Sequence, residues 1–394
     1  MKDYDGIADI KILDCLFRTG FVQAPYSLKT SSFKKLLRQN LRMQHKGHCI
    51  GSKPLYTLKD FTSASEEPSH LVVLVHGLHG SSKDFLFLEK SLLQLDKTQS
   101  LVVFRPSVNE GRTTDGICKG GSRLAEAVRA FCSKYPSLRS ISFVGFSLGG
   151  LYVRYALFLL MDKCSPEKSL ICGLKPYNIL LVASPNLGVS GFGPFRYLPR
   201  VLQMAIVTFL GETIRELFLF DRKKFDGRVP LLWAMTDDAF ISAIAQFPRR
   251  FLFANIRYDV EVPYGTAALQ PAIRHVLNSS IQAESSVSVK RTPNISIWKK
   301  YLECSSGSSW RSVPFSFGKY LSTQRVMKLE ELMASRLRSI DWYLFEVDFG
   351  SFLPPVHDSI VAVSRNSMFE RVFRKGKDAV EVISHLIVKE ETVS

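Results

Sequence analysis

A serine stands between two glycines where two apolar stretches meet, in the segment FVGFSLGGLYVRYAL at residues 143–157. The pattern Gly145-x-Ser147-x-Gly149 is typical of a nucleophile elbow, a tight strand-to-helix turn that exposes a serine hydroxyl. An ordinary turn uses the same residue types, and the pattern alone arises by chance in roughly one chain in ten of this length. Acyl transfer by a serine has further requirements, so the surrounding sequence must decide between the two interpretations.

The first requirement is a pair of N–H donors for the oxygen that becomes anionic during acyl transfer. An apolar run leads directly into the sequence HGLHG at residues 76–80, where glycine lets the backbone turn its amides toward a substrate. We assign the oxyanion hole to the backbone N–H groups of Leu78 and Leu148. We expect His76 and Gly77 to shape this loop.

An acid and a histidine should follow the serine in that order, as they do in α/β-hydrolases. Asp259 ends the predicted strand Phe251–Tyr258, and His357 lies about ten residues beyond the predicted strand Trp342–Val347, in a proline-rich loop. We therefore expect His357 to be the base for Ser147 and Asp259 to orient it. A simple turn aspartate is the alternative for Asp259. The weaker candidates are the acids Asp237, Asp238 and Glu261 and the histidines His275 and His385.

Short runs rich in Val, Ile and Leu alternate with helical stretches from His70 onward. Such runs are typical of parallel strands buried on both faces. They predict an α/β fold of the α/β-hydrolase class: a mostly parallel central sheet with helices on both faces and a helical lid or cap insertion. The predicted strands of this part are Leu71–Val75, Leu101–Phe104, Ile141–Val144 and Ile179–Val182. The predicted helices are Gly121–Tyr135, Gln324–Arg338 and Lys377–Ile387.

Two stretches interrupt the alternation of strands and helices. A lid-like insertion is predicted over 190–247, where Phe195–Phe220 is apolar around most of a helix. A buried core helix is the alternative interpretation of this segment. A second insertion, a long loop and a helix, is predicted over 270–340, and it contains a Ser-rich surface loop at Asn278–Val289.

Composition and charge restrict the class of protein further. The 394 residues are 46% hydrophobic, carry a formal net charge of +16, and divide into a basic extension at 1–65 and a hydrolase domain at 66–390. The positive charge suits an anionic lipid surface or a merely solvated exterior, and no nucleic-acid motif accompanies it. Seven dispersed cysteines argue against a disulfide framework or a zinc site. Because no signal peptide or membrane-spanning run is evident, we expect a cytoplasmic protein with peripheral membrane contact.

The chain resembles the lipase-like serine esterase family of the α/β-hydrolase fold from about His70 to Glu390. The segments that carry the resemblance are LVVLVHGLHGSSKDF, GICKGGSRLAEAV, SFVGFSLGGLYVRYAL, LVASPNLGV, FISAIAQFPRRFLFANIRYDVEVPYGT and VHDSIVAV. The resemblance implies that Ser147, Asp259 and His357 form a catalytic triad that needs no cofactor or metal. It also implies lipid ester substrates, such as monoacylglycerols or phospholipids, and contact with lipid droplets or internal membranes.

Three departures from the family pattern leave substrate preference open. Relatives often carry His at the positions of Phe146 and Asn186, and an Arg near Gly265. The sequence therefore predicts a serine hydrolase that cleaves lipid acyl esters through an acyl-enzyme. An acyl-protein thioesterase or depalmitoylase would use the same residues on a thioester. A catalytically silent hydrolase fold that binds lipid or a partner is the alternative outside the enzyme class.

Overall fold

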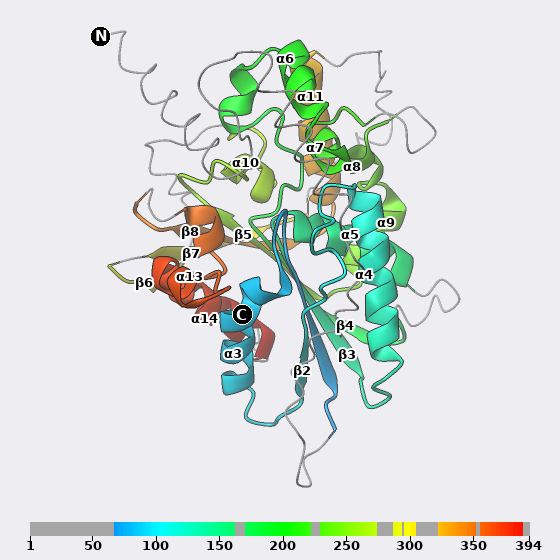
Figure 1. Ribbon diagram of the computed structural model, residues 1–394, viewed down its shortest axis with the longest axis vertical. Helices are drawn as coiled ribbons and strands as arrows, with labels where there is room; N and C mark the ends of the chain where they lie inside the picture. The colour runs from blue at the N-terminus through cyan, green and yellow to red at the C-terminus, as the bar shows by residue number, and fades with distance from the viewer. Residues whose placement is uncertain are drawn as a thin grey trace, which may run out of the picture. The chain divides into compact units, whose positions relative to one another are not determined.

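The centre of the fold is a mostly parallel β-sheet (Figure 1). The structure is a computed structural model that describes residues 67–161, 170–221, 229–273, 287–293, 295–304, 322–351 and 355–388. Within these ranges, eight strands are ordered β2-β1-β3-β4-β5-β8-β7-β6. Their bounds are β1 His70–Val75, β2 Leu101–Phe104, β3 Ser140–Phe146, β4 Lys175–Val182, β5 Arg249–Asn255, β6 Val287–Arg291, β7 Ser296–Leu302 and β8 Trp342–Asp348. The first six strands in this order pair in parallel, whereas β7 and β6 are antiparallel to their neighbours.

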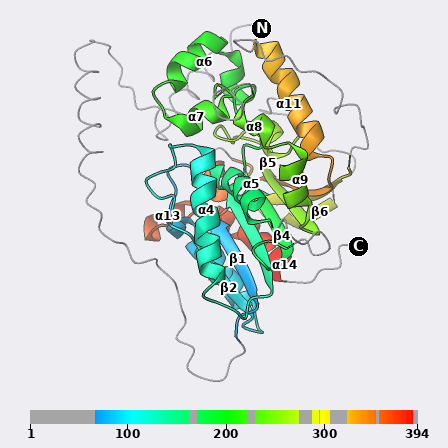
Figure 2. The same cartoon turned by 90° about the vertical axis from the view of Figure 1, so that its right-hand side faces the viewer.

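Helices cover both faces of the sheet (Figures 1 and 2). On one face α3 (Leu86–Leu95) packs against α14 (Lys377–Val388), and on the other α5 (Leu148–Leu160) packs against α4 (Ile117–Cys132) and α9 (Asp238–Ala245). Side chains along each strand alternate between the two faces of the sheet. Every second side chain therefore belongs to the hydrophobic core between the sheet and the helices α3 and α14. That core takes Val72 and Leu74 of β1, Val144 and Phe146 of β3, Leu180 and Val182 of β4, Phe251 and Phe253 of β5, and Phe345 and Val347 of β8.

The remaining helices lie between these elements or follow the sheet's carboxyl edge. The structure contains η1 Ser82–Phe85, η2 Gly193–Tyr197, α6 Arg200–Val207, α7 Glu212–Leu217, α8 Leu231–Ala234, α10 Tyr264–Ala267, α11 Thr323–Leu337, α12 Val356–Ser359, α13 Ser367–Val372 and η4 Arg374–Gly376. In both views α6, α7, α8 and α11 gather beyond the ends of the parallel strands (Figures 1 and 2).

The predicted α/β-hydrolase class is confirmed, and so are the predicted core strands. The prediction of one apolar helix over Phe195–Phe220 is wrong, because the segment is divided among η2, α6 and α7. Pro199 is the N-cap of α6, where proline cannot continue a helix from the residues before it. Gly211, with a φ of +95°, is the N-cap of α7 and separates α7 from α6. The strand that was predicted over Phe251–Tyr258 ends at Asn255.

The second insertion differs from its prediction as well. Its Ser-rich stretch ends in a strand, because Val287 begins β6, which forms an antiparallel hairpin with β7 at the sheet edge. The earlier residues of that stretch, His275 and the whole of 1–65 lie outside the described residues. The helix predicted over Gln324–Arg338 is α11, so the insertion adds both strands and a helix.

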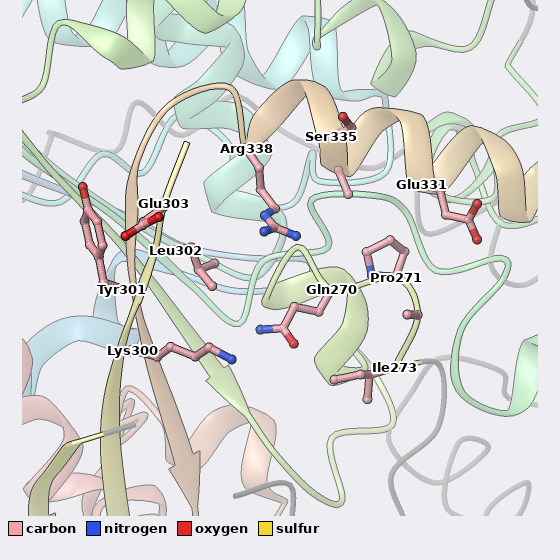
Figure 3. Close-up of a pocket in the computed structure, with 12 residues that line it drawn as sticks. Gln270, Pro271, Ile273, Lys300, Tyr301, Leu302, Glu303, Glu331, Ser335 and Arg338 are labelled. Carbon is pink, nitrogen blue, oxygen red and sulfur yellow. The ribbon is translucent and has the colours of Figure 1, made fainter. Parts of the chain in front are cut away.

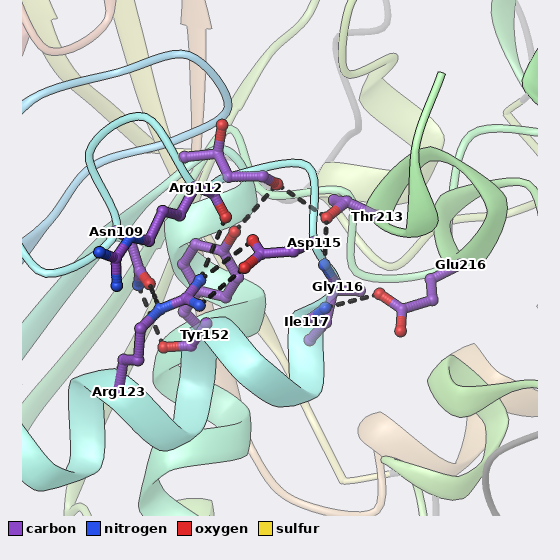
Figure 4. A network of polar contacts seen from close by, with 11 residues as sticks. Asn109, Arg112, Asp115, Gly116, Ile117, Arg123, Tyr152, Thr213 and Glu216 are labelled. Carbon is purple, nitrogen blue, oxygen red and sulfur yellow. Dashed lines mark hydrogen bonds and ion pairs between the residues drawn. The ribbon is translucent and has the colours of Figure 1, made fainter. Parts of the chain in front are cut away.

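A buried polar network joins α7 to the start of α4 (Figure 4). The Thr213 hydroxyl accepts a hydrogen bond from the Gly116 N–H at 2.9 Å and donates one to the Thr113 carbonyl oxygen at 2.7 Å. Glu216 accepts from the Ile117 N–H at 2.6 Å, so a carboxylate occupies the positive end of the α4 dipole. These contacts fix α7 to the body of the domain, whereas three of the eight residues of α6 are exposed to solvent.

Replacing the buried Glu216 carboxylate should destabilise the domain. We expect Glu216→Ala to lower the free energy of unfolding by about 1–3 kcal/mol, since the Ile117 N–H loses its acceptor and the α4 dipole its counter-charge. Glu126→Ala, which removes an exposed carboxylate from α4, should change the free energy of unfolding by less than about 0.5 kcal/mol. Urea titration of both variants measures the difference. Equal midpoints would contradict the importance of this contact.

Candidate active site

Ser147 stands in a strained turn between β3 and α5. Its φ is +54° and its ψ −128°, a backbone conformation that side chains rarely adopt. A Cβ on Gly149 would lie 2.1 Å from the Val75 carbonyl oxygen, and a Cβ on Gly145 would lie 2.5 Å from the Gly150 Cα. Both flanking positions therefore require glycine because another segment of backbone passes directly against them. This is the backbone geometry that a nucleophile elbow requires.

The loop after β1 lies against the Ser147 side chain. A Cβ on Gly77 would be 2.7 Å from the Ser147 Cβ and 3.2 Å from its Oγ. The His76 ring is buried, and its Nδ1 lies 3.0 Å from the Gly77 carbonyl oxygen, to which the ring N–H donates. Burial lowers the pKa of His76, so the ring stays neutral and supports this hydrogen bond. The loop backbone thus approaches the serine hydroxyl closely.

The two predicted oxyanion donors follow neighbouring strands. Leu78 lies in the turn that the Gly80 N–H closes on the Gly77 carbonyl oxygen at 3.1 Å. Leu148 is the buried first residue of α5, a position whose N–H has no acceptor within the helix. Because β1 and β3 pair in parallel, both residues lie at the same edge of the sheet. Their role as the donor pair stays a prediction.

A hydrogen bond joins Asp259 to His357 across adjacent strand ends. Asp259 Oδ2 lies 3.0 Å from His357 Nδ1, and both side chains are buried. The same oxygen accepts from Asn255 Nδ2 at 2.7 Å, while Oδ1 accepts from the Val262 N–H at 2.9 Å. The Asp259 carboxylate is therefore held by three donors that fix its orientation. The His357 loop of the prediction is in fact a helical turn, α12, which presents the ring.

Phe146 forms one wall of the imidazole site. Its ring centroid lies 4.9 Å from that of His357, with 34° between the planes. Because Phe146 immediately precedes Ser147, this contact brings the end of β3 and α12 into one neighbourhood. Sequence reasoning had noted Phe146 only as a departure from the family pattern. Asn255 was missed because it was assigned to the interior of a longer strand.

Glu261 is a second carboxylate at the same imidazole. Its Oε2 lies 4.0 Å from His357 Nε2, on the ring nitrogen opposite the one that Asp259 contacts. The sequence offered Glu261 only as a weaker alternative to Asp259. The structure gives the two acids separate positions, because Asp259 is enclosed by hydrogen bonds and the Glu261 side chain is partly exposed.

These charges perturb the titration of both partners. Burial lowers the pKa of His357, but the negative charges of Asp259 and Glu261 outweigh it, together with the hydrogen bond from Asp259, so the pKa is raised above its usual range. Burial raises the pKa of Glu261 to about 7, although the charge of His357 opposes this. Burial also raises the pKa of Asp358, which follows His357 in α12. The imidazole is therefore surrounded by acidic groups.

The other candidates form contacts elsewhere. Asp237 pairs with Arg336 at 2.9 Å, and Asp238 is exposed at the start of α9. His385 lies on α14, 4.0 Å from Glu381. Asn186, a departure from the family pattern, is buried, and its carbonyl oxygen accepts a hydrogen bond from Arg154.

A cavity of about 910 Å³ opens beside α11 and β7 (Figure 3). The residues Lys300, Glu303, Glu331 and Arg338 give it a charged lining, and Gln270 lies at its wall. None of the candidate residues of the serine site lines it. The cavity is therefore separate from the candidate active site.

Comparison with known proteins supports the same family. Residues 65–271, a little over half of the chain, match the family model described as "Putative serine esterase (DUF676)". The chain is 32% identical over 219 residues to "Putative lipase C4A8.10" of Schizosaccharomyces pombe, covering 53% of this chain and 27% of that protein. It is 30% identical over 220 residues to "Putative lipase ROG1" of Saccharomyces cerevisiae, covering 55% and 30%. The chain thus spans about a third or less of these relatives' length.

Solved structures with some likeness include two lipid hydrolases. Phospholipase PlaB from Legionella pneumophila is 15% identical with a TM-score of 0.34, over 48% of this chain and 40% of that one. Lipase BlEst2 from Bacillus licheniformis in its propeptide form is 13% identical with a TM-score of 0.33, over 60% and 58%.

Removing the Glu261 charge should lower the pKa of His357. We expect Glu261→Gln to lower it by about one unit, because a negative charge 4.0 Å from Nε2 favours the imidazolium. Titration of the His357 ring protons by NMR measures the shift. Glu303→Gln, which changes an exposed carboxylate in the separate cavity, serves as the control and should leave that pKa unchanged. Identical titration curves for wild type and Glu261→Gln would contradict the coupling.

Proposed function

The chain belongs to the DUF676 family of serine esterases, and from this membership we propose that it hydrolyses acyl esters of lipids with Ser147 as nucleophile. The observation that carries the proposal is the buried hydrogen bond between Asp259 and His357, made beside the elbow that holds Ser147. A histidine oriented in this way through Nδ1 leaves Nε2 available for proton transfer.

The first half of the reaction forms an acyl-enzyme. Ser147 Oγ attacks the ester carbonyl carbon while His357 Nε2 takes the hydroxyl proton. Asp259 keeps the imidazole in the required tautomer and stabilises the imidazolium that forms. The N–H groups of Leu78 and Leu148 stabilise the oxyanion, where one such donor is commonly worth about 3–4 kcal/mol. His357 then gives its proton to the departing alcohol as the carbon–oxygen bond breaks.

The second half repeats these steps with water. His357 takes a proton from a water molecule that attacks the acyl carbon, and it returns that proton to Ser147 Oγ as the fatty acid departs. The side chains in this scheme carry out only proton transfer, nucleophilic attack and charge stabilisation.

The segment from η2 to Phe209, which includes α6, supports contact with a lipid surface. It exposes four large apolar side chains, Tyr197 (60% exposed), Val201 (74%), Leu202 (47%) and Phe209 (81%). Exposed apolar groups in one segment often mark an interaction site. In the described ranges, no helix has both the length and the hydropathy to cross a membrane. We therefore propose that this segment is a lid that touches the surface of a membrane or lipid droplet, aided by the chain's positive charge.

Ser147 should be the residue that reacts with an active-site probe. A fluorophosphonate should label the wild type at Ser147, while Ser147→Ala should fold normally, escape labelling and lose turnover by about 10⁵-fold or more. Turnover is measured on a panel of mono-, di- and triacylglycerols, a lysophospholipid and a phospholipid, and the panel also identifies the lipid class. Folded wild type that neither labels nor hydrolyses any ester would support the silent alternative.

The acid is tested separately from the nucleophile. Asp259→Asn should reduce turnover by about 10⁴-fold through the wrong imidazole tautomer. Asp237→Asn, which alters the contact with Arg336, should keep turnover within about twofold of wild type. The reverse pattern would show that the acid is misassigned.

Polar substitution of the exposed segment should impair lipid contact. The double variant Val201→Ser with Phe209→Ser should weaken binding to anionic vesicles by about tenfold or more, because each side chain contributes about 1.5–3 kcal/mol when buried in lipid. Vesicle co-sedimentation measures binding. The loss of activity on dispersed lipid should exceed the loss on a soluble butyrate ester. Met368→Ser, which removes an exposed apolar side chain on α13, is the matched control; equal binding by both variants would contradict the assignment.

A further inference from the structure

Two acids of one loop lie near opposite nitrogens of the His357 imidazole ring. Asp259 contacts His357 Nδ1, and Glu261, two residues later, approaches Nε2 at 4.0 Å. The proposed reaction gives Asp259 its role but uses no group at the position of Glu261. A side chain beside Nε2 lies near the atoms that exchange protons with that nitrogen.

The Nε2 side of the imidazole is where the leaving alcohol must be. In the acylation step the bond between the acyl carbon and the ester oxygen breaks, and that oxygen receives the proton that Nε2 took from Ser147. The ester oxygen thus comes within hydrogen-bond reach of Nε2, and the remainder of the alcohol extends past it. The Glu261 side chain is 22% exposed, so part of it reaches the solvent side of the site.

The charge near this position is negative. Among the described residues, His357 is the sole ion-pair partner of Glu261. Asp259 is already engaged by three donors, and Asp358 is the third acid near the ring. Arg365 acts on Asp358 but is itself paired with Asp84 at 2.5 Å. In the described ranges no lysine or arginine pairs with Glu261, so the charge that opposes its carboxylate is that of the imidazole itself when the ring is protonated.

We propose that Glu261 is a specificity-determining residue that selects the leaving alcohol by charge. This inference rests on the proposed serine esterase function and adds a substrate class to it. Esters with a cationic group close to the scissile oxygen are favoured, and esters with an anionic group there, including lipids whose phosphate adjoins the ester, are disfavoured. The attraction and repulsion act across the partly exposed site, where charges interact more strongly than in bulk water.

The experiment compares three butyrate esters that share one acyl group. They are the choline ester, its uncharged isostere 3,3-dimethylbutyl butyrate, and 2-sulfoethyl butyrate, so that the leaving group is cationic, neutral or anionic. At pH 8 and low salt we expect wild-type kcat/KM to favour the choline ester over the isostere by about tenfold, and the isostere over the sulfoethyl ester by a similar factor. Glu261→Gln should bring both ratios to within about twofold of one, whereas Glu261→Asp should retain part of the preference.

The dependence on pH gives an independent readout. Burial raises the pKa of Glu261 to about 7, so the carboxylate is charged above that pH and becomes neutral below it. The wild-type preference for the cationic ester should therefore shrink between pH 8 and pH 6, and the flat ratios of Glu261→Gln should not change. Glu303→Gln, an exposed carboxylate in the separate cavity, should keep the wild-type ratios.

The outcomes separate this inference from the function on which it rests. Turnover of all three esters with ratios that Glu261→Gln leaves unchanged would overturn the role of Glu261 and leave the esterase function standing. A wild type that hydrolyses none of the esters and fails to label at Ser147 would overturn the esterase function itself. Loss of the charge preference in Glu261→Gln, with fluorophosphonate labelling retained, would support the proposal.

Discussion

The close passage of β1 against the turn after β3 is the constraint on which the site depends. Gly149 admits no side chain because the Val75 carbonyl oxygen occupies the place of a Cβ, and Gly145 admits none because α5 begins there. Because Gly145 and Gly149 are both held against other backbone, Ser147 takes a φ of +54° that an unconstrained serine would avoid. The same passage continues into Gly77, whose backbone meets the serine side chain. One steric arrangement thus positions both the hydroxyl and the loop proposed to stabilise an oxyanion.

Parallel pairing of β5 with β8 has the corresponding effect on the acid and the histidine. Asn255 pairs with Val347, so the loops that leave these strands begin side by side although 98 positions separate Asp259 from His357. The chain between them is accommodated without disturbing this pairing, because the β6–β7 hairpin extends the far edge of the sheet. Parallel strands deliver their carboxyl ends to one edge, and this explains why residues distant in sequence can share a site there.

Features that depend on the local sequence pattern could be predicted. The buried strands are continuous apolar runs, and the glycines around Ser147 are required where another backbone segment lies against them. Features that depend on contacts with residues distant in the sequence could not be predicted. β6 is a mostly exposed edge strand, so it lacks the apolar run that marks the inner strands. Asn255, the last residue of β5, donates both to Asp259 and to the Val356 carbonyl oxygen of α12, about a hundred positions away, and no local pattern reveals such a contact.

The two acids at His357 show why residue type alone could not assign their roles. Both follow β5 within the same few residues, and both carry a carboxylate. Asp259 is the shorter side chain and its oxygens accept from Asn255, Val262 and the ring, which fixes it as a buried, fully satisfied acceptor. Glu261 has an extra methylene, and its side chain is partly exposed, although partial burial of its carboxyl still raises its pKa. An acid enclosed by hydrogen-bond donors, such as Asp259, is suited to orienting the imidazole. A partly exposed acid, such as Glu261, is suited to interacting with the leaving alcohol that the imidazole protonates.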